Sequence, residues 1–96
     1  MGIKTTMSFL REIAGHFGKK NQEAKLVEEL GELLKELSIN IRENTVTENT
    51  VSEMADVHIL IEQLLEIYGK QEEFNEEVAR KIKRTIERIK DGYYEI

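Results

Sequence analysis

The sequence contains no cysteine and no proline, and each absence excludes particular sites or local structures. Without cysteine it has no disulfide, no thiolate metal ligand and no cysteine nucleophile. Without proline, no residue forces a helix to break. No apolar run reaches the roughly 18 residues that a membrane span needs, and no signal-peptide pattern opens the chain. We therefore expect a cytoplasmic protein without a membrane partner.

Basic residues are outnumbered, 14 against 19 acidic residues, which gives a formal net charge of −5. Binding to duplex nucleic acid needs a dominant basic surface, so we expect no nucleic-acid partner. The hydrophobic fraction of 40% is too high for a disordered chain. A length of 96 residues indicates one domain, 1–96.

Apolar residues recur at helical spacing in four segments, and no segment alternates with the period of a strand. The first helix is expected to end at Gly18, and the second to begin after an N-cap at Asn21. Residues 38–48 lack a helical period and predict a loop. A third helix is expected to begin near Thr47–Thr50 and to end at Gly69. The predicted fold class is all-α, with four helices.

The third helical segment is apolar on more than one side, which indicates burial on more than one side. Three neighbouring helices in a small subunit can hardly surround it, so we expect a homo-oligomer. The alternative is a helix enclosed within one subunit. The fourth segment carries a single apolar stripe: Phe74, Val78, Ile82, Ile86 and Ile89.

Two pairs of carboxylates stand three residues apart in the middle helices. Glu29 and Glu32 belong to the second segment, and Glu53 and Asp56 to the third. Residues three apart share a side of a helix, so antiparallel packing would bring the pairs face to face. Four carboxylates would suit Mg²⁺, which prefers oxygen ligands. The alternative is solvated surface charge, because such pairs arise easily among 19 acids.

Glu53 stands at the head of a helical ladder whose other members are core-type residues. The ladder comprises Glu53, Val57, Leu60, Leu64 and Ile67. A carboxylate in line with a buried stripe must be protonated, paired or bound to a metal. The alternative is a capping box, in which Glu53 bonds the backbone N–H of Thr50. That alternative fails if the helix begins at Thr47 or earlier.

Basic residues line one edge of the fourth segment, at spacings of three and four: Lys81, Arg84 and Arg88. Such an edge would clamp phosphate oxygens, since arginine makes forked contacts and lysine supplies a point charge. Lys25, on the carboxylate side of the second segment, would act likewise. The alternatives are a solvated face paired with neighbouring glutamates and, for Lys25, an ion pair with Glu29.

Other features carry less information. The phosphate-loop motif GxxxxGK[ST] is absent, and no serine or threonine has an identifiable base. His16 and His58 are interpreted as structural. Gly31, inside a helix, indicates close approach by another helix or by a ligand. Four aromatic residues are candidates for stacking on a base: Tyr68, Phe74, Tyr93 and Tyr94. The favoured alternative for Tyr68 and Phe74 is a place in the core or an interface, and no residue is assigned as the base reader.

The ordered set of motifs resembles the MazG-like all-α nucleotide pyrophosphohydrolases, in particular the short, phage-type members. Their signature is ExxE, a spacer and ExxD; here the two halves are Glu29-x-x-Glu32 and Glu53-x-x-Asp56, with 20 residues between them. The segment 81–89 is similar to the basic C-terminal helix of those members. The resemblance spans roughly residues 7 to 89.

The resemblance implies a four-helix unit, assembled as a homodimer or homotetramer, that cleaves nucleoside triphosphates to monophosphate and pyrophosphate. It also implies one or two Mg²⁺ ions per site, with Mn²⁺ as a substitute. The implied metal ligands are Glu29, Glu32, Glu53 and Asp56. The implied phosphate-binding residues are Lys81, Arg84 and Arg88. We hypothesise that Glu29 or Glu32 accepts the proton of the attacking water.

Two other functions stay open from the sequence. One is a non-catalytic all-α oligomer that binds a partner through the broad apolar face of the third helix. The other is an enzyme of the same fold restricted to one pyrimidine deoxynucleotide, such as dUTP or dCTP.

Overall fold

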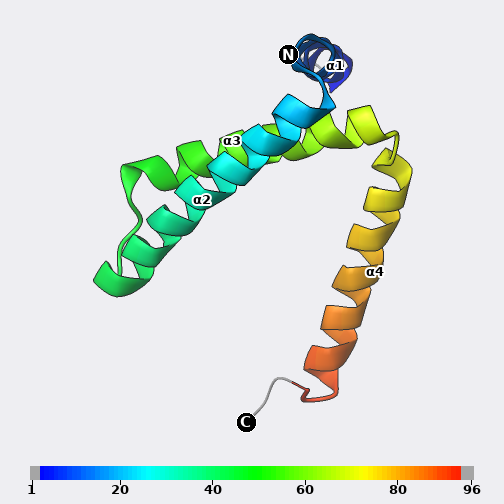
Figure 1. The fold of residues 1–96 in the computed structure, drawn as a ribbon. Helices are drawn as coiled ribbons and strands as arrows, with labels where there is room; N and C mark the ends of the chain where they lie inside the picture. Colours follow the sequence, from blue (N-terminus) through cyan, green and yellow to red (C-terminus); the bar gives the residue numbers. More distant parts are fainter. Residues whose placement is uncertain (1–2, 94–96) are drawn as a thin grey trace.

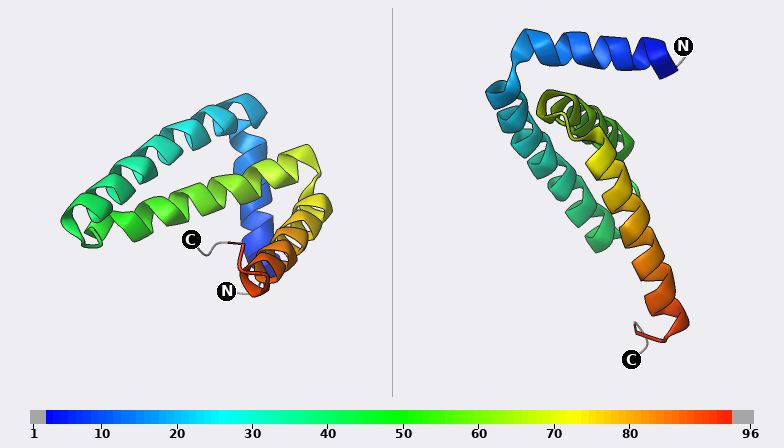
Figure 2. Two further views of the ribbon diagram at one scale, coloured as in Figure 1. Left: turned by 90° about the horizontal axis from the view of Figure 1, so that it is seen from below. Right: turned by 90° about the vertical axis from the view of Figure 1, so that its right-hand side faces the viewer.

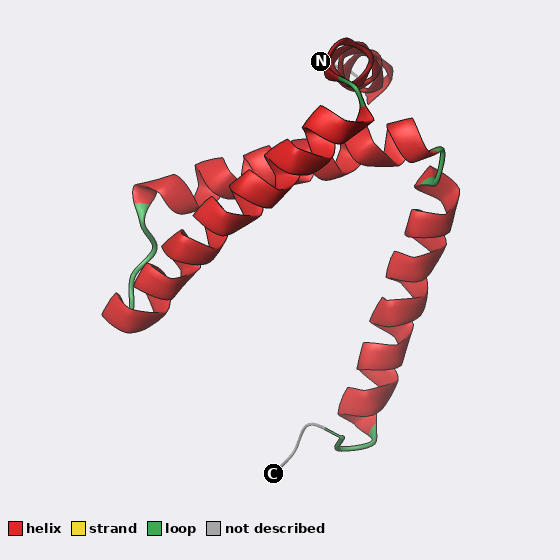
Figure 3. Cartoon of the chain, in the orientation of Figure 1, coloured by secondary structure: helices red, strands yellow, loops and turns green. Residues whose placement is uncertain are grey.

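The computed structural model describes the backbone of residues 3–93 and the side chains of residues 9–13 and 15–93. Over this range the chain forms helices and no strand, which confirms the all-α prediction (Figure 3). The helices are α1 (Ile3–Phe17), α2 (Lys19–Glu43), α3 (Glu48–Tyr68) and α4 (Gln71–Lys90). Tyr94 lies outside the described residues.

Helices α2 and α3 form an antiparallel pair, with α1 on one side of it and α4 on the other (Figures 1 and 2). Helix α1 packs mainly across α3. Among the described residues, α4 contacts only α3, near the turn that joins them. The pair therefore forms the centre of the subunit, and α4 extends away from it.

Polar contacts near both ends of the α2–α3 pair hold the two helices in register. Near one end of the pair, the amide of Gln22 donates a hydrogen bond to Gln63. Near the other end, Asn40 accepts a hydrogen bond from the backbone N–H of Thr47 at 3.0 Å and donates one to the Thr50 hydroxyl at 2.9 Å. These contacts connect α2 with α3, or with the residue just before it, near both ends of the pair.

The predicted loop at 38–48 is wrong, because α2 continues to Glu43 and leaves only residues 44–47 between the helices. Asn44 ends α2 in the left-handed conformation, with φ 50°. The last turns of α2 are mostly solvent-exposed. Their helical state is supported by the contacts of Asn40 with α3, which a periodicity argument does not include.

The predicted N-cap at Asn21 is also wrong. Helix α2 begins at Lys19, directly after Gly18, whose φ of 80° suits glycine. The side chain of Asn21 instead donates a hydrogen bond to the carbonyl of Phe17, at 2.8 Å. Asn21 therefore satisfies the last carbonyl of α1 rather than the first N–H groups of α2.

The buried apolar residues belong to α3: Val57, Leu60, Leu64 and Leu65. Three of them belong to the predicted ladder, and its other two members, Glu53 and Ile67, are half-buried. Many other large apolar side chains are exposed. On α2 these side chains recur at spacings of three and four: Val27, Leu30, Leu34, Leu37 and Ile41. Within the described chain, no helix is both long enough and apolar enough to cross a membrane.

We expect Thr47→Val to destabilise the protein by about 1–3 kcal/mol, since it removes the hydroxyl that donates a hydrogen bond to the buried carboxylate of Glu36. The free energy of unfolding from urea titrations measures the effect. Thr45→Val is the matched control, because Thr45 is exposed. Equal losses in the two variants would contradict a role for this contact in closing the α2–α3 pair.

Candidate metal centre

Three carboxylates from two helices converge between α2 and α3. Glu29, Glu53 and Asp56 each offer an oxygen atom, and these atoms lie within 4.8 Å of one another. Glu29 is buried, Glu53 is half-buried and Asp56 is exposed. The antiparallel register accounts for the convergence, because it places Glu29 opposite the α3 turn that carries the other two. The cluster is therefore closed toward the core and open toward solvent.

The position of Glu53 within α3 excludes the capping-box alternative. Helix α3 begins at Glu48 with Thr47 as its N-cap, so Glu53 lies beyond the first turn. The backbone N–H of Thr50 donates to the carbonyl of Thr47, at 3.2 Å, and not to Glu53. Glu53 is thus free of a capping role.

The pKa values of two of the carboxylates move in opposite directions. A hydrogen bond to Glu29 raises the pKa of Glu53 to about 7, and burial and the charges of Glu29, Asp56 and Glu32 add to the rise. The same hydrogen bond, followed by that of Lys25, lowers the pKa of Glu29. Below neutral pH, Glu53 therefore keeps the proton and Glu29 carries the charge.

One oxygen of this cluster has no hydrogen-bond partner among the residues that the structure describes. It is the buried Oε2 atom of Glu53. Buried polar atoms are nearly always satisfied, so an orphaned carboxylate oxygen beside two further carboxylates requires an explanation. A cation bound between the three carboxylates would satisfy it.

The remaining predicted ligand, Glu32, is exposed and is not among the three converging residues. Its charge nevertheless contributes to the raised pKa of Glu53, so it lies near the cluster. Lys25 pairs with Glu29 at 3.2 Å and with Glu28 at 3.7 Å. The ion-pair alternative for Lys25 is therefore observed, and its contact with phosphate stays a prediction.

The structure does not bring the predicted basic edge to the carboxylates of the same subunit. Lys81, Arg84 and Arg88 lie on α4, which makes no contact with α2 in the described residues. The guanidinium of Arg88 instead lies over the ring of Tyr93, 4.7 Å from its centroid. The phosphate-binding role of these three residues stays a prediction.

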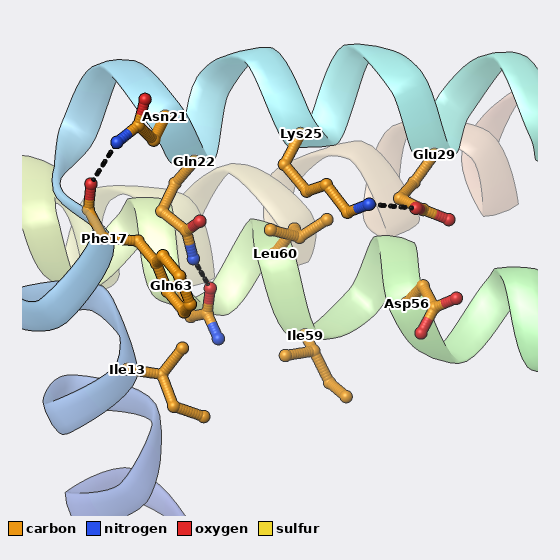
Figure 4. Close-up of a pocket in the computed structure, with 10 residues that line it drawn as sticks. All are labelled: Ile13, Phe17, Asn21, Gln22, Lys25, Glu29, Asp56, Ile59, Leu60 and Gln63. Carbon is orange, nitrogen blue, oxygen red and sulfur yellow. Dashed lines mark hydrogen bonds and ion pairs between the residues drawn. The ribbon is translucent and has the colours of Figure 1, made fainter.

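A cavity of about 540 Å³ adjoins the carboxylates, between α1, α2 and α3 (Figure 4). Glu29, Asp56 and Lys25 line one end, and the hydrogen-bonded amides of Gln22 and Gln63 lie at the other. The apolar part of the lining comprises Ile59 and Leu60, between the two ends, and Phe17 and Ile13, beside the amides. This size and lining are typical of a small-molecule site.

Sequence reasoning missed the amide end of the cavity. Gln63 is 2% exposed and Gln22 is 5% exposed. A glutamine within the apolar run of α3 was the available signal, because a buried amide needs a partner.

The two histidines and Gly31 lie away from this cavity's lining. His16 and His58 are exposed. No atom of the described residues, apart from the backbone of α2 itself, lies within 4 Å of the position that a Cβ would take at Gly31. The close approach expected at Gly31 is therefore not found within the described subunit.

No family model, curated protein or solved structure matches the chain. The resemblance to MazG-like enzymes accordingly depends on the motifs and stays a prediction.

We expect Glu53→Gln to change how stability depends on pH. Between pH 4.5 and about 7 the unfolded chain has lost the Glu53 proton while the folded protein retains it, so rising pH destabilises the folded state through this group. The variant lacks this proton, and its advantage over the original chain should grow across that window and then level off. Urea midpoints measured in EDTA test this. The control is Glu76→Gln, at an exposed position of α4, whose stability should follow that of the unmodified protein at every pH. If the stability of Glu53→Gln also followed that of the unmodified protein, the raised pKa of Glu53 would be contradicted.

Proposed function

We propose that the protein is a cytoplasmic, Mg²⁺-dependent nucleotide pyrophosphohydrolase that converts nucleoside triphosphates to monophosphates and pyrophosphate, in a house-cleaning role. The observation that carries the proposal is the convergence of Glu29, Glu53 and Asp56 around an unsatisfied carboxylate oxygen. The ordered ExxE and ExxD motifs and the adjoining cavity support the same conclusion.

The donor set fits Mg²⁺. The converging atoms are all carboxylate oxygens, which a hard cation prefers, and the solvent-exposed side leaves room for the waters that Mg²⁺ retains. Glu29, Glu53 and Asp56 would hold the ion. Glu32, whose charge acts on Glu53, would add to the negative charge around it. Mn²⁺, which accepts the same ligands, should substitute. When bound, the ion would act as a Lewis acid that offsets charge on the phosphates and makes a water more acidic.

The chain's own residues have distinct roles in this proposal. Glu53 must lose its proton before it binds a cation, whereas Glu29 is already ionised. Glu29 or Glu32 accepts a proton as water oxygen bonds to the α-phosphorus and the bond to the bridging oxygen breaks. Pyrophosphate then leaves with the bridging oxygen. Lys25, beside Glu29 in the cavity, places a positive charge where the phosphates enter.

The cavity would take the nucleoside part of the substrate. Its apolar walls suit the faces of a flat heterocycle, and the amides of Gln22 and Gln63 suit the polar edge. A pocket of this kind accommodates any base of suitable size, or selects one pyrimidine through the amides. A nucleotide panel distinguishes these two cases.

The exposed apolar side chains support self-association as a homodimer or homotetramer. Five of them on α2 recur at spacings of three and four, which is the pattern of a helix–helix seam. They also favour the second function, a non-catalytic oligomer that binds a partner. The two functions differ in whether purified protein hydrolyses nucleotides.

Purified protein with Mg²⁺ should release nucleoside monophosphate and pyrophosphate from at least one member of a panel of ribo- and deoxynucleoside triphosphates. EDTA should abolish the reaction, and Mn²⁺ should restore it. Glu53→Gln should lower kcat/KM by about 100-fold or more, since it removes a metal ligand. Glu76→Gln, on the exposed side of α4, should retain full activity. A folded protein that hydrolyses none of the panel with either metal would overturn the enzymatic proposal.

Leu34→Glu should weaken self-association, because it places a charge in the exposed apolar stripe of α2. Sedimentation equilibrium should show the unmodified chain at two or four times its mass of 11.2 kDa, and the variant shifted toward that mass. Lys35→Glu introduces the same side chain one residue away, outside the stripe, and should keep the oligomer. Monomeric behaviour of the unmodified chain would contradict the assembly.

A further inference from the structure

Helix α4 is incompletely packed in a single subunit. None of its residues is buried, and among the described residues it contacts only α3. Its apolar stripe is open to solvent, with exposed fractions from 41% to 60%: Val78, Ile82, Ile86 and Ile89. Most of the stability of a protein helix comes from burying its apolar face, so this stripe needs a partner surface.

The second half of α4 is strongly basic. Residues 80–90 contain six basic residues and one acid, Glu87. Cations flank the apolar stripe on both edges, with Lys81 and Arg84 on one side and Lys83 on the other. Lys81 and Arg84 form no ion pair within 4 Å of any residue that the structure describes, although their charges help to lower the pKa of Glu77, whose main partner is Arg80. The partner surface of α4 should therefore be both apolar and acidic.

The α2–α3 pair has these properties. Residues 19–68 contain eleven acids and five basic residues, with the carboxylate cluster near the middle. The α2 stripe from Val27 to Ile41 is exposed, and Met54 on α3 is exposed as well. At 1.5 Å per residue the α2 stripe is about 21 Å long and the α4 stripe about 17 Å, so their lengths match.

A second copy of the chain would cover both the stripe of α4 and the exposed face of the α2–α3 pair. Each subunit carries one basic apolar helix and one acidic apolar pair, and they do not meet within the subunit, because α4 does not contact α2. A two-fold axis would let each copy cover the other, since a closed dimer uses the same surface twice. Helix α4 also extends on the side of the pair that α1 leaves uncovered (Figures 1 and 2).

We infer that α4 of one copy packs along the α2–α3 pair of a second copy and brings Lys81 and Arg84 to that copy's Glu29–Glu53–Asp56 cluster. Each phosphate-binding site is then completed in trans. The inference depends on the proposed metal site and adds where the phosphate cations come from. A triphosphate beside three carboxylates requires cations, and within the described part of one subunit the cation that pairs with the cluster is Lys25.

A spin-label experiment tests the arrangement without measuring activity. Because the chain lacks cysteine, Lys81→Cys provides a single site for a nitroxide. The labelled chain also carries Glu29→Gln and Glu53→Gln, which disable its own metal site, and is mixed with excess unlabelled, unmodified chain. Mn²⁺ bound to the unmodified chain should broaden the nitroxide spectrum, because the label lies at the partner's site.

The reciprocal mixture is the matched control. A labelled chain with intact carboxylates, in excess unlabelled chain carrying Glu29→Gln and Glu53→Gln, should show little broadening. Broadening in this second mixture alone would place α4 at its own carboxylates and overturn the inference. Mn²⁺ binding without broadening in either mixture would also overturn it. Failure to bind Mn²⁺ at all would instead overturn the proposed function together with the inference.

Activity provides a second readout. Glu53→Gln and Lys81→Ala/Arg84→Ala should each be nearly inactive alone. After random mixing, half of the dimers are mixed, and one of their two sites combines intact carboxylates with an intact partner helix. The mixture should regain roughly a quarter of the unmodified activity. No recovery would show that both sets of residues act within one subunit.

Discussion

The antiparallel register of α2 and α3 is the constraint on which the rest of the structure depends. It is held by an amide pair near one end and by the contacts of Asn40 near the other. These contacts are polar and partly or wholly buried, so a one-residue slip would leave several donors and acceptors unsatisfied, at about 1–3 kcal/mol each. The same register sets Glu29 against Glu53 and Asp56. The relative positions of these three carboxylates therefore depend on hydrogen bonds that lie one or more helical turns away from them.

Three carboxylates so close together repel one another when all are ionised. The raised pKa of Glu53 and the ion pair of Lys25 with Glu29 reduce this repulsion. Glu53 has the raised pKa and also the oxygen without a partner among the described residues. It is therefore the residue whose ionised form a cation would stabilise most. Such an arrangement is costly for a purely structural role, because apolar residues would fill the position at lower cost. The cost becomes intelligible if a divalent ion is the normal partner of the cluster.

The sequence predicted the features that depend on local periodicity and missed those that depend on tertiary contacts. The ladder from Glu53 placed a carboxylate at the edge of the buried stripe correctly, because α3 keeps a regular 3.6-residue period. The end of α2 was missed because its support comes from the contacts of Asn40 with Thr47 and Thr50, which periodicity does not include. Gln63 was missed because its partner lies 41 residues away, where no local pattern shows it.

The direction of α4 is the feature that periodicity could least predict, and it changes how the motifs relate to each other. The basic stripe and the acidic pairs looked like halves of one site in the sequence, yet α4 diverges from the α2–α3 pair after the turn at Gly69. A helix with an apolar stripe gains stability only where that stripe is covered, and here its own subunit does not cover it. Covering it with a second copy would satisfy the apolar stripe and the unpaired cations in one step. Assembly and phosphate binding would then be the same structural event, and a dissociated subunit would retain its carboxylates but lose the cations that allow a triphosphate to approach them.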